Sequence, residues 1–297
     1  MASKAILTGA TGFVGSNLCR KLLSLNWEVS IIVRSNSNLD DISDIKNKIT
    51  IYVDDGNIIS LAEFMKNINA DVVFHLASFF LAEHETEDID KLIESNIIFG
   101  VNVLEAMKLS NTRLIINTGT SWQHFQNDVY NPVCLYAATK EAFENILEYY
   151  VQAENFRAIT LKLFDTYGEN DKRNKLINLL NKFAAEKTKL NMSPGEQLID
   201  LVHIEDAVSA FIQAYDYLVR NVEIKHKQYG VSSDRVIQLK ELIHLYEQIT
   251  GKNIFVNWGG RVYRKREVMT LWKSFEKLPN WKCVISLEDG LKRLAKI

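Results

Sequence analysis

The sequence predicts an α/β fold built on a doubly wound parallel sheet. Three observations lead to this fold class. Short apolar runs of strand length alternate with helical stretches from residue 4 onwards. The run at residues 71–78 is continuously hydrophobic, as expected of a strand buried on both faces. A glycine-rich turn joins the first run to the first helix, a connection typical of parallel units with right-handed crossovers.

Length and composition describe an ordinary globular chain. The 297 residues are 47% hydrophobic and 24% charged, and a net charge of −2 argues against a nucleic-acid partner. No apolar run approaches the ~18 residues of a membrane span, and no signal peptide is visible, so we expect a cytoplasmic protein with no membrane partner. The cysteines and histidines show no metal or disulfide spacing, so we expect reduced thiols and no metal.

The first predicted strand, residues 4–8, leads into a helix through Gly9-x-x-Gly12-x-x-Gly15. Glycines let the backbone approach a pyrophosphate, which the helix N-terminus then holds. The alternative is that these glycines serve only a tight turn. The expected cofactor contacts in this segment are Thr8, Gly9, Thr11, Gly12, Phe13, Val14 and Gly15.

The second predicted strand, residues 28–33, ends at Arg34 and Ser35. An NAD site usually presents a carboxylate here to the ribose 2′-hydroxyl, whereas an arginine suits the 2′-phosphate of NADP. Arg34 therefore favours NADPH or NADP as the cofactor, with NAD as the alternative. The third strand, residues 49–53, precedes Asp55 and Gly56, where we expect the adenine; a helix at 58–68 follows.

The fourth predicted strand, residues 71–78, is followed by a long helix near 89–109. His75 is expected to be a packed residue at the strand end. The mixed apolar and polar segment after the strand either lines a substrate pocket or lies in a solvent-exposed loop. The expected contacts are Leu76, Ala77 and Ser78 for the cofactor, and Phe80 and His84 for the substrate.

Polar residues follow the fifth predicted strand, residues 113–117, at the edge where open α/β sheets bind ligands. The hydroxyl groups of Thr118, Thr120 and Ser121 suit hydrogen bonding to a substrate carbonyl. The next helix, 135–153, carries Tyr136 and Lys140, which share one face. An ammonium beside a phenol lowers the tyrosine pKa, as a general acid/base requires. The alternative is an ordinary surface pair.

Several motifs occur together and in order along most of the chain. They are Gly9-x-x-Gly12-x-x-Gly15, His75-Leu-Ala-Ser78, Asn96, the strand-five hydroxyls, Tyr136-x-x-x-Lys140 and Lys162-Leu-Phe-Asp-Thr-Tyr-Gly168. The combination resembles the extended short-chain dehydrogenase/reductases, the NAD-dependent epimerase/dehydratase group. The resemblance implies a Rossmann NADP-binding domain of residues 1–168 plus about 201–236, and a smaller substrate lobe of about 169–200 plus 237–297.

The resemblance also implies roles for individual residues. Thr118 matches the Ser/Thr of the family's catalytic triad, with Thr120 or Ser121 as substitutes if the turn register differs. Tyr136 matches the proton donor, and Lys140 the residue that orients the nicotinamide ribose. Further cofactor contacts implied by the motifs are Asn96, Leu163 and Phe164.

Within the group, the chain resembles most the CDP-abequose and CDP-paratose synthases, NADPH-dependent reductases of a nucleotide-linked 4-keto-6-deoxyhexose. Dehydratases of the group carry an Asp-Glu pair where this chain has Gly119 and Thr120, which argues against a dehydratase. The segments that carry the closer similarity are Leu92–Ile97, Asn117–Ser121, Gly195–Asp200 and Tyr263–Met269.

The second lobe is expected to bind the nucleotide sugar. We expect helices at 173–186 and 238–250 in this lobe, and a strand and turn at 190–195 near the base. An amphipathic helix at 205–220 and a strand at 227–231 are expected in the first domain. Family members have a phosphate-binding arginine where this chain has Ile199, while Arg264 matches a second one; Lys175 or Arg266 is expected to assist. Trp258, Trp272 and Trp281 are expected in the core.

The expected substrate contacts come from both lobes. In addition to Phe80, His84, Thr120 and Ser121, they are Asp165, Asn174, Lys175, Met192, Gln197 and Arg264.

These expectations combine into one functional hypothesis with two alternatives. The hypothesis is NADPH-dependent reduction of the C4 keto group of a nucleoside-diphosphate-4-keto-6-deoxyhexose. The alternatives are a nucleotide-sugar 4-epimerase with tightly bound NAD, and a non-catalytic NADP(H)-binding protein. The resemblance further implies a homodimer in which the helices near 89–109 and 135–153 of two subunits pair.

Overall fold

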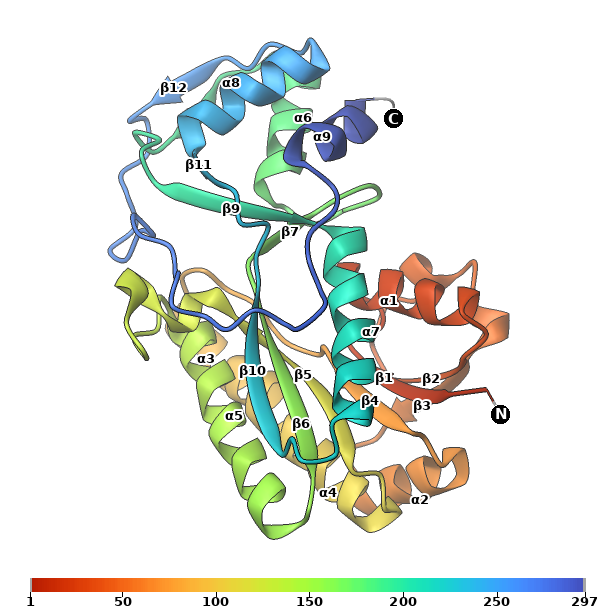
Figure 1. The fold of residues 1–297 in the computed structure, drawn as a ribbon. Coiled ribbons are helices and arrows are strands. Elements are labelled where there is room, and N and C mark those ends of the chain that lie inside the picture. The colour runs from red at the N-terminus through yellow and green to blue at the C-terminus, as the bar shows by residue number, and fades with distance from the viewer. Residues whose placement is uncertain (1, 296–297) are drawn as a thin grey trace.

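A seven-stranded parallel sheet is the largest element of the computed structural model, which describes residues 2–295 (Figure 1). Every neighbouring pair of strands in this sheet runs parallel. The predicted doubly wound α/β fold is therefore confirmed. The strand order is β10 (His226–Val231), β6 (Arg157–Leu163), β5 (Leu114–Thr120), β4 (Val72–His75), β1 (Lys4–Thr8), β2 (Glu28–Arg34) and β3 (Thr50–Asp54).

Helices cover both faces of this sheet. Because successive side chains of a strand point to opposite faces, β1 sends Ala5 and Leu7 into one core and Ile6 into the other. The first core includes leucines of α1 and a phenylalanine of α7, whereas the second includes leucines of α2, α4 and α5. The helices are α1 (Phe13–Ser24) and α7 (Ile204–Arg220) on one face, and α2 (Ile58–Ile68), α4 (Phe99–Ser110) and α5 (Leu135–Ala153) on the other.

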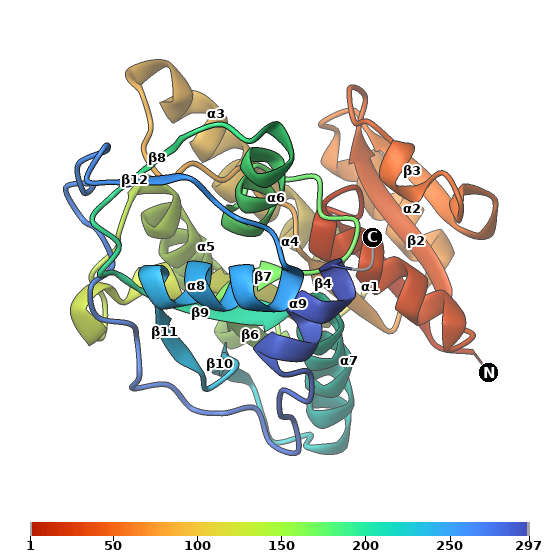
Figure 2. The same cartoon turned by 90° about the horizontal axis from the view of Figure 1, so that it is seen from above.

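A smaller lobe lies beyond the carboxyl edge of the large sheet, at the top of Figure 1 and facing the viewer in Figure 2. It has its own core, in which Leu180, Leu242 and Leu291 are fully buried. Its strands form a three-stranded sheet, β11 (Val236–Gln238), β9 (Leu198–His203) and β7 (Asp165–Tyr167), and a pair, β12 (Val256–Trp258) and β8 (Leu190–Met192). Its helices are α6 (Leu176–Glu186), α8 (Leu239–Thr250) and α9 (Leu287–Ala295).

The chain crosses between the two parts more than once. After α7 it enters β10, which pairs with β6, so the expected return of residues 227–231 to the large sheet is confirmed. After β12 the segment 259–286 passes back along the large sheet, where Gly230 N donates to Glu276 O at 3.0 Å. The indole Nε1 of Trp281 then donates to Ser209 Oγ of α7 at 2.9 Å.

Of the three tryptophans expected in the core, Trp272 is buried and Trp281 packs against the first core. The expectation is wrong for Trp258, which is 37% exposed. Trp258 lies in the two-stranded sheet of the small lobe, and its ring packs on Gly195 and beneath the Lys240 ammonium. A two-stranded sheet at the edge of a small lobe has too little apolar surface around it to enclose an indole.

The long helix expected near 89–109 is present with an irregular turn inside it. It consists of α3 (Ile89–Ile93), a π-helical turn (Glu94–Ile98) and α4. Single π-helical turns often occur at functional sites because they redirect the side chains on one face. This turn carries Asn96, which is buried.

The lengths of the helices and the positions of the cysteines bear on membrane spanning and on disulfide formation. Across residues 2–295, no helix combines the length and the apolar composition needed to cross a membrane. In the same range the three cysteines form no disulfide, and burial raises the pKa of the Cys19 thiol to about 12. The Cys19 thiol is therefore protonated at neutral pH and packs as a small apolar side chain.

Candidate active site

A cavity of about 1060 Å³ opens at the carboxyl edge of the large sheet. The strand order reverses there, because the chain moves from β1 out to β3 and then crosses back to β4. Open α/β sheets bind their ligands at such a reversal. The walls come from the segment after each of β1, β2, β3, β4, β5 and β6, together with Tyr136 of α5 and residues before α6.

The glycine turn after β1 forms the floor of the cavity. Gly9 has a φ of +70°, and a Cβ there would lie 2.6 Å from the Ala77 nitrogen, so only glycine fits. A Cβ on Gly15 would lie 2.1 Å from the Gly9 carbonyl oxygen. No side chain within residues 2–295 caps the N-terminus of α1, so its first amide groups are available to an anion. Thr11, Gly12, Phe13 and Val14 also line the cavity.

Two residues expected to touch the cofactor instead support the cavity wall from behind. Thr8 Oγ1 lies 2.9 Å from His75 Nδ1 and accepts a hydrogen bond from the Ala77 nitrogen at 3.1 Å. Asn96 bonds both backbone groups of Phe79, at 2.7 and 3.0 Å. Neither Thr8 nor Asn96 lines the cavity. They fix the segment after β4, whose residues Leu76, Ala77 and Ser78 do line it.

His75 is packed at the strand end, as expected. It is 1% exposed, and its ring lies 4.9 Å from that of Phe143. Burial lowers its pKa to about 3, with a smaller contribution from the charge of Lys140. His75 is therefore neutral at physiological pH and acts as a hydrogen-bonding partner of Thr8.

The far end of the cavity carries polar groups from β2 and β3. Arg34 and Ser35 line it together with Asn36 and Ser37, and no carboxylate follows β2 directly. Within residues 2–295 the exposed Arg34 forms no ion pair. Asp55 and Gly56, expected near the adenine, line the same end.

Thr118 and Tyr136 both line the cavity. Thr118 Oγ1 is buried and has no hydrogen-bond partner within residues 2–295, so it is available to a ligand oxygen. Tyr136 is 9% exposed, and its ring meets the Phe80 ring edge-to-face with centroids 4.9 Å apart. The Thr118 hydroxyl group comes from β5, and the Tyr136 hydroxyl group comes from α5, a helix that covers one face of the large sheet.

The expected lowering of the Tyr136 pKa is wrong for this ligand-free site. Burial raises the pKa of Tyr136 above its ordinary value, and the neighbouring Ser78 side chain opposes this only in part. The physical reason is that a buried phenolate loses its hydration, and the nearby acidic groups, including Asp165 and Glu144, also disfavour a negative charge there. Tyr136 is therefore protonated at neutral pH, which is the state of a proton donor.

Lys140 lies one helical turn behind Tyr136 and is 1% exposed. It does not line the cavity. Burial lowers its pKa to about 8, while the charge of Glu144 acts in the opposite direction. The ammonium thus loses its proton only slightly above neutral pH.

Several expected substrate residues gather on the side of the cavity below the small lobe. Lys175 Nζ lies 4.0 Å from the centre of the Phe80 ring and 3.7 Å from Asp165 Oδ1. Thr120 and Ser121 lie on the same wall, as do Leu163 and Phe164 of the expected cofactor set. A cation and a carboxylate ten residues apart are thereby brought together with the aromatic face of Phe80, which is distant in sequence.

Five expected substrate residues do not line the cavity: His84, Asn174, Met192, Gln197 and Arg264. His84 and Asn174 are exposed, whereas Met192 and Gln197 are buried within the small lobe. Arg264 pairs with Glu267 at 2.8 Å and lies 5.5 Å from the ring of Trp122, a cavity residue. Ile199 packs against the core of the small lobe.

The cavity also contains residues that the motifs did not identify. Trp122 and Arg173 line it, and the Arg173 guanidinium lies 4.3 Å from the Phe13 ring while bonding Asp171 and Thr166. Glu94, Ile98 and Asn102 line it from the long helix. Their spacing of four residues is the signal that places them on one helical face.

The residues present fit a nicotinamide dinucleotide. The uncapped N-terminus of α1 suits a pyrophosphate, the polar end with Arg34 suits an adenosine ribose, and the unpartnered Thr118 hydroxyl lies where a reacting group would sit. Within residues 2–295, no cluster of three or more His, Cys, Asp or Glu side chains is arranged to hold a metal ion.

Comparisons with known proteins agree with this geometry. CDP-abequose synthase of Yersinia pseudotuberculosis is 26% identical over 269 residues, covering 90% of each chain. CDP-abequose synthase of Salmonella muenchen is 24% identical over 294 residues, covering 98% of this chain and 96% of that one.

The fold has close counterparts among solved structures. UDP-glucuronic acid 4-epimerase of Bacillus cereus, in complex with UDP-glucuronic acid and NAD, superposes with a TM-score of 0.86 at 22% identity, covering 99% and 98% of the two chains. Residues 5–226 match the NAD dependent epimerase/dehydratase family. The chain therefore belongs to the NAD dependent epimerase/dehydratase family.

Proposed function

We propose that this protein is an NADPH-dependent reductase of the C4 keto group of a nucleoside-diphosphate-4-keto-6-deoxyhexose. The observation that carries the proposal is one cavity in which Thr118 and Tyr136 lie between Arg34 at one end and Lys175 at the other. The similarity to two CDP-abequose synthases over nearly the whole chain supports the choice of a nucleotide-linked sugar. Gly119 and Thr120 lack the acid and base that elimination of water requires.

Arg34 supports NADPH as the cofactor. Its guanidinium is exposed at the cavity wall, and Ser35 and Ser37 add hydroxyl groups beside it. A guanidinium and neighbouring hydroxyls suit a 2′-phosphate, whereas a ribose 2′-hydroxyl is usually met by a carboxylate at this position. A reductase exchanges its cofactor in every turnover, which fits an open, solvent-reachable site for the adenosine end.

The side chains would assist reduction in separate ways. When bound, the nicotinamide supplies a hydride to C4. Thr118 Oγ1 donates a hydrogen bond to the C4 oxygen, and Tyr136 transfers its phenolic proton to that oxygen as negative charge develops there. Tyr136 suits this role because its raised pKa keeps the proton in place until the stronger base, the alkoxide, forms. The Lys140 ammonium stabilises the phenolate left behind.

The substrate diphosphate needs cations on the small-lobe side. Lys175 and Arg173 both line the cavity there; Arg173 bonds the Asp171 carboxylate through Nε and Nη2, which leaves its Nη1 for a ligand. Arg264 stands further out and is neutralised by Glu267. We infer that Lys175, together with Arg173, supplies the charge that family members take from the arginine replaced by Ile199.

A homodimer through α4 and α5 is part of the same proposal. Leu109 of α4 is 49% exposed and Tyr149 of α5 is 60% exposed. A dimer through these two helices would cover both side chains. Sizing chromatography at micromolar concentration is expected to give a dimer, and a monomer alone would contradict the assignment.

The test of function is NADPH absorbance loss with a panel of CDP-, dTDP-, UDP- and GDP-4-keto-6-deoxyhexoses, with NADH as the cofactor control. We expect rapid loss with one nucleotide and NADPH, and much slower loss with NADH. No loss, together with nicotinamide cofactor released only on denaturation, would favour the 4-epimerase instead. Reversible NADPH binding without any turnover would favour the non-catalytic alternative.

A further inference from the structure

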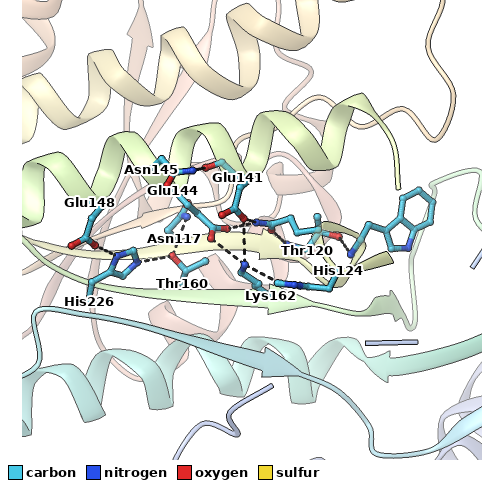
Figure 3. A network of polar contacts seen from close by, with 12 residues as sticks. Asn117, Thr120, His124, Glu141, Glu144, Asn145, Glu148, Thr160, Lys162 and His226 are labelled. Carbon is cyan, nitrogen blue, oxygen red and sulfur yellow. Dashed lines mark hydrogen bonds and ion pairs between the residues drawn. The ribbon is translucent and has the colours of Figure 1, made fainter. Parts of the chain in front are cut away.

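A buried charge cluster lies behind the cavity wall, between β5, β6 and α5 (Figure 3). Its centre is Lys162 of β6, which is 1% exposed. Lys162 Nζ lies 3.3 Å from Glu144 Oε2 and 3.6 Å from Glu141 Oε2. Glu144 is 2% exposed, so both members of the central ion pair are withdrawn from water.

Gln123 connects this cluster to the turn that follows Thr118. Its Oε1 accepts a hydrogen bond from the Thr120 nitrogen at 2.9 Å, which closes the turn at the end of β5. Its Nε2 donates to Glu141 at 2.5 Å and to Glu144 at 3.0 Å. One buried amide thus joins the cavity wall to the helix that carries Tyr136.

Gly119 lies directly against the same cluster. A Cβ there would be 2.7 Å from Glu144 Oε1 and 2.9 Å from Lys162 Cγ. The residue after Thr118 therefore has no room for a side chain, and β5 rests on the charged groups without an intervening layer. Glu144 and Lys162 thus lie in direct contact with the strand backbone next to Thr118.

The cluster also reaches the C-terminal segment. His124 Nε2 lies 3.0 Å from Lys162 Nζ, and the His124 ring stacks on Trp272 with centroids 3.9 Å apart. Trp272 in turn stacks over Phe164, a cavity residue, at 6.4 Å. The turn after β5, the Tyr136 helix and β6, each of which contributes to the cavity wall, therefore meet the C-terminal segment around one buried ammonium.

We propose that Glu144 and Lys162 are positioning residues for the reaction, which hold the turn at residues 118–122 and the Tyr136 helix in one fixed arrangement. This inference rests on the proposed function for its kinetic readout. A buried ion pair is suited to the role, because removing one partner leaves an uncompensated charge and the remaining groups must rearrange. Displacing reacting groups by about 1 Å is enough to slow a reaction about 100-fold.

The test compares four variants of the full chain. Glu144→Gln removes one charge of the pair with little change in shape. Gln123→Met removes the hydrogen bond to the turn but keeps the charges of Glu144 and Lys162. It tests the same proposal if Glu144→Gln does not fold. Lys162→Arg keeps the cation. Glu105→Gln is the matched control, because Glu105 of α4 accepts a hydrogen bond from Tyr150 of the Tyr136 helix at 2.7 Å and makes no contact with the cluster.

Kinetics and amide hydrogen exchange are measured on each NADPH-bound variant. We expect Glu144→Gln and Gln123→Met to lower kcat by about tenfold or more, with NADPH affinity and KM within about threefold. Exchange should accelerate in residues 118–131 only. Lys162→Arg should retain most of the turnover, and Glu105→Gln should resemble the parent protein.

Two results would overturn the proposal. One is a folded Glu144→Gln or Gln123→Met variant with unchanged kcat and unchanged exchange. The other is acceleration of exchange over the whole chain with kcat and KM changing together, which is the signature of general destabilisation. If the parent protein shows no reductase activity, local acceleration in residues 118–131 still supports the positioning role, and the proposed function alone fails.

Discussion

Replacing Arg34 by alanine is the sharpest test of cofactor choice. The guanidinium lies at the polar end of the cavity and forms no ion pair within residues 2–295, so its removal leaves no buried partner unsatisfied. Only contacts with the ligand should be lost. A hydrogen bond to a charged group contributes about 1.5–3 kcal/mol, which corresponds to a loss of NADPH affinity of about 10- to 150-fold. Since Arg34 is exposed, the lower part of that range is expected.

The assay is a fluorescence titration of NADPH and of NADH with the parent protein, Arg34→Ala and a control. Lys46→Ala is a suitable control, because Lys46 is also exposed but lies outside the cavity. We expect the NADPH dissociation constant to be raised in Arg34→Ala by a factor in the lower part of the range of about 10- to 150-fold. The NADH dissociation constant should stay within about threefold of that of the parent protein. Equal affinities for NADPH in the variant and the parent protein would refute the assignment of the 2′-phosphate to Arg34.

Three further predictions concern the reaction and the cofactor turn. Tyr136→Phe should lower turnover by about 10²–10⁴-fold while NADPH affinity is preserved; near-normal turnover would exclude Tyr136 as the acid. Because burial lowers the pKa of Lys140 to about 8, its ammonium is present below that pH and lost above it. We therefore expect kcat/KM to fall as the pH rises through about 8, and Lys140→Met to lack this step; the same step in the variant would assign it elsewhere. Gly15→Ala should destabilise the protein by about 1–3 kcal/mol in thermal unfolding, because the new Cβ would lie 2.1 Å from the Gly9 oxygen; an unchanged midpoint would contradict the close approach.

Local patterns were sufficient to predict the main sheet and most of its helices. The helix expected at 135–153 is α5 over the same residues, and the helix expected at 58–68 is α2. Apolar runs and glycine turns specify these elements because each depends on neighbours in sequence. The π-helical turn at Glu94–Ile98 was not predicted, because the apolar pattern of the long helix carries no local signal for it.

The features that the sequence did not predict depend on burial and on contacts between residues distant in sequence. Lys162 belongs to an apolar strand pattern, and nothing in that pattern indicates that its ammonium is buried against Glu144 and Glu141. The raised pKa of Tyr136 follows from burial by Phe80 and its other neighbours, whereas the spacing to Lys140 alone suggested the opposite direction. Arg173 reaches the cavity because the segment before α6 folds back over Phe13.

The most direct test of the proposed reaction is the fate of a deuterium label. NADPH carrying deuterium at both C4 positions of the nicotinamide is incubated with the protein and each nucleotide sugar of the panel, and any product is analysed by mass spectrometry and NMR. The account predicts a product sugar with the label at C4 and an amount of NADP equal to that of product. A product with no label, formed without net consumption of NADPH, would contradict the reductase and identify an epimerase.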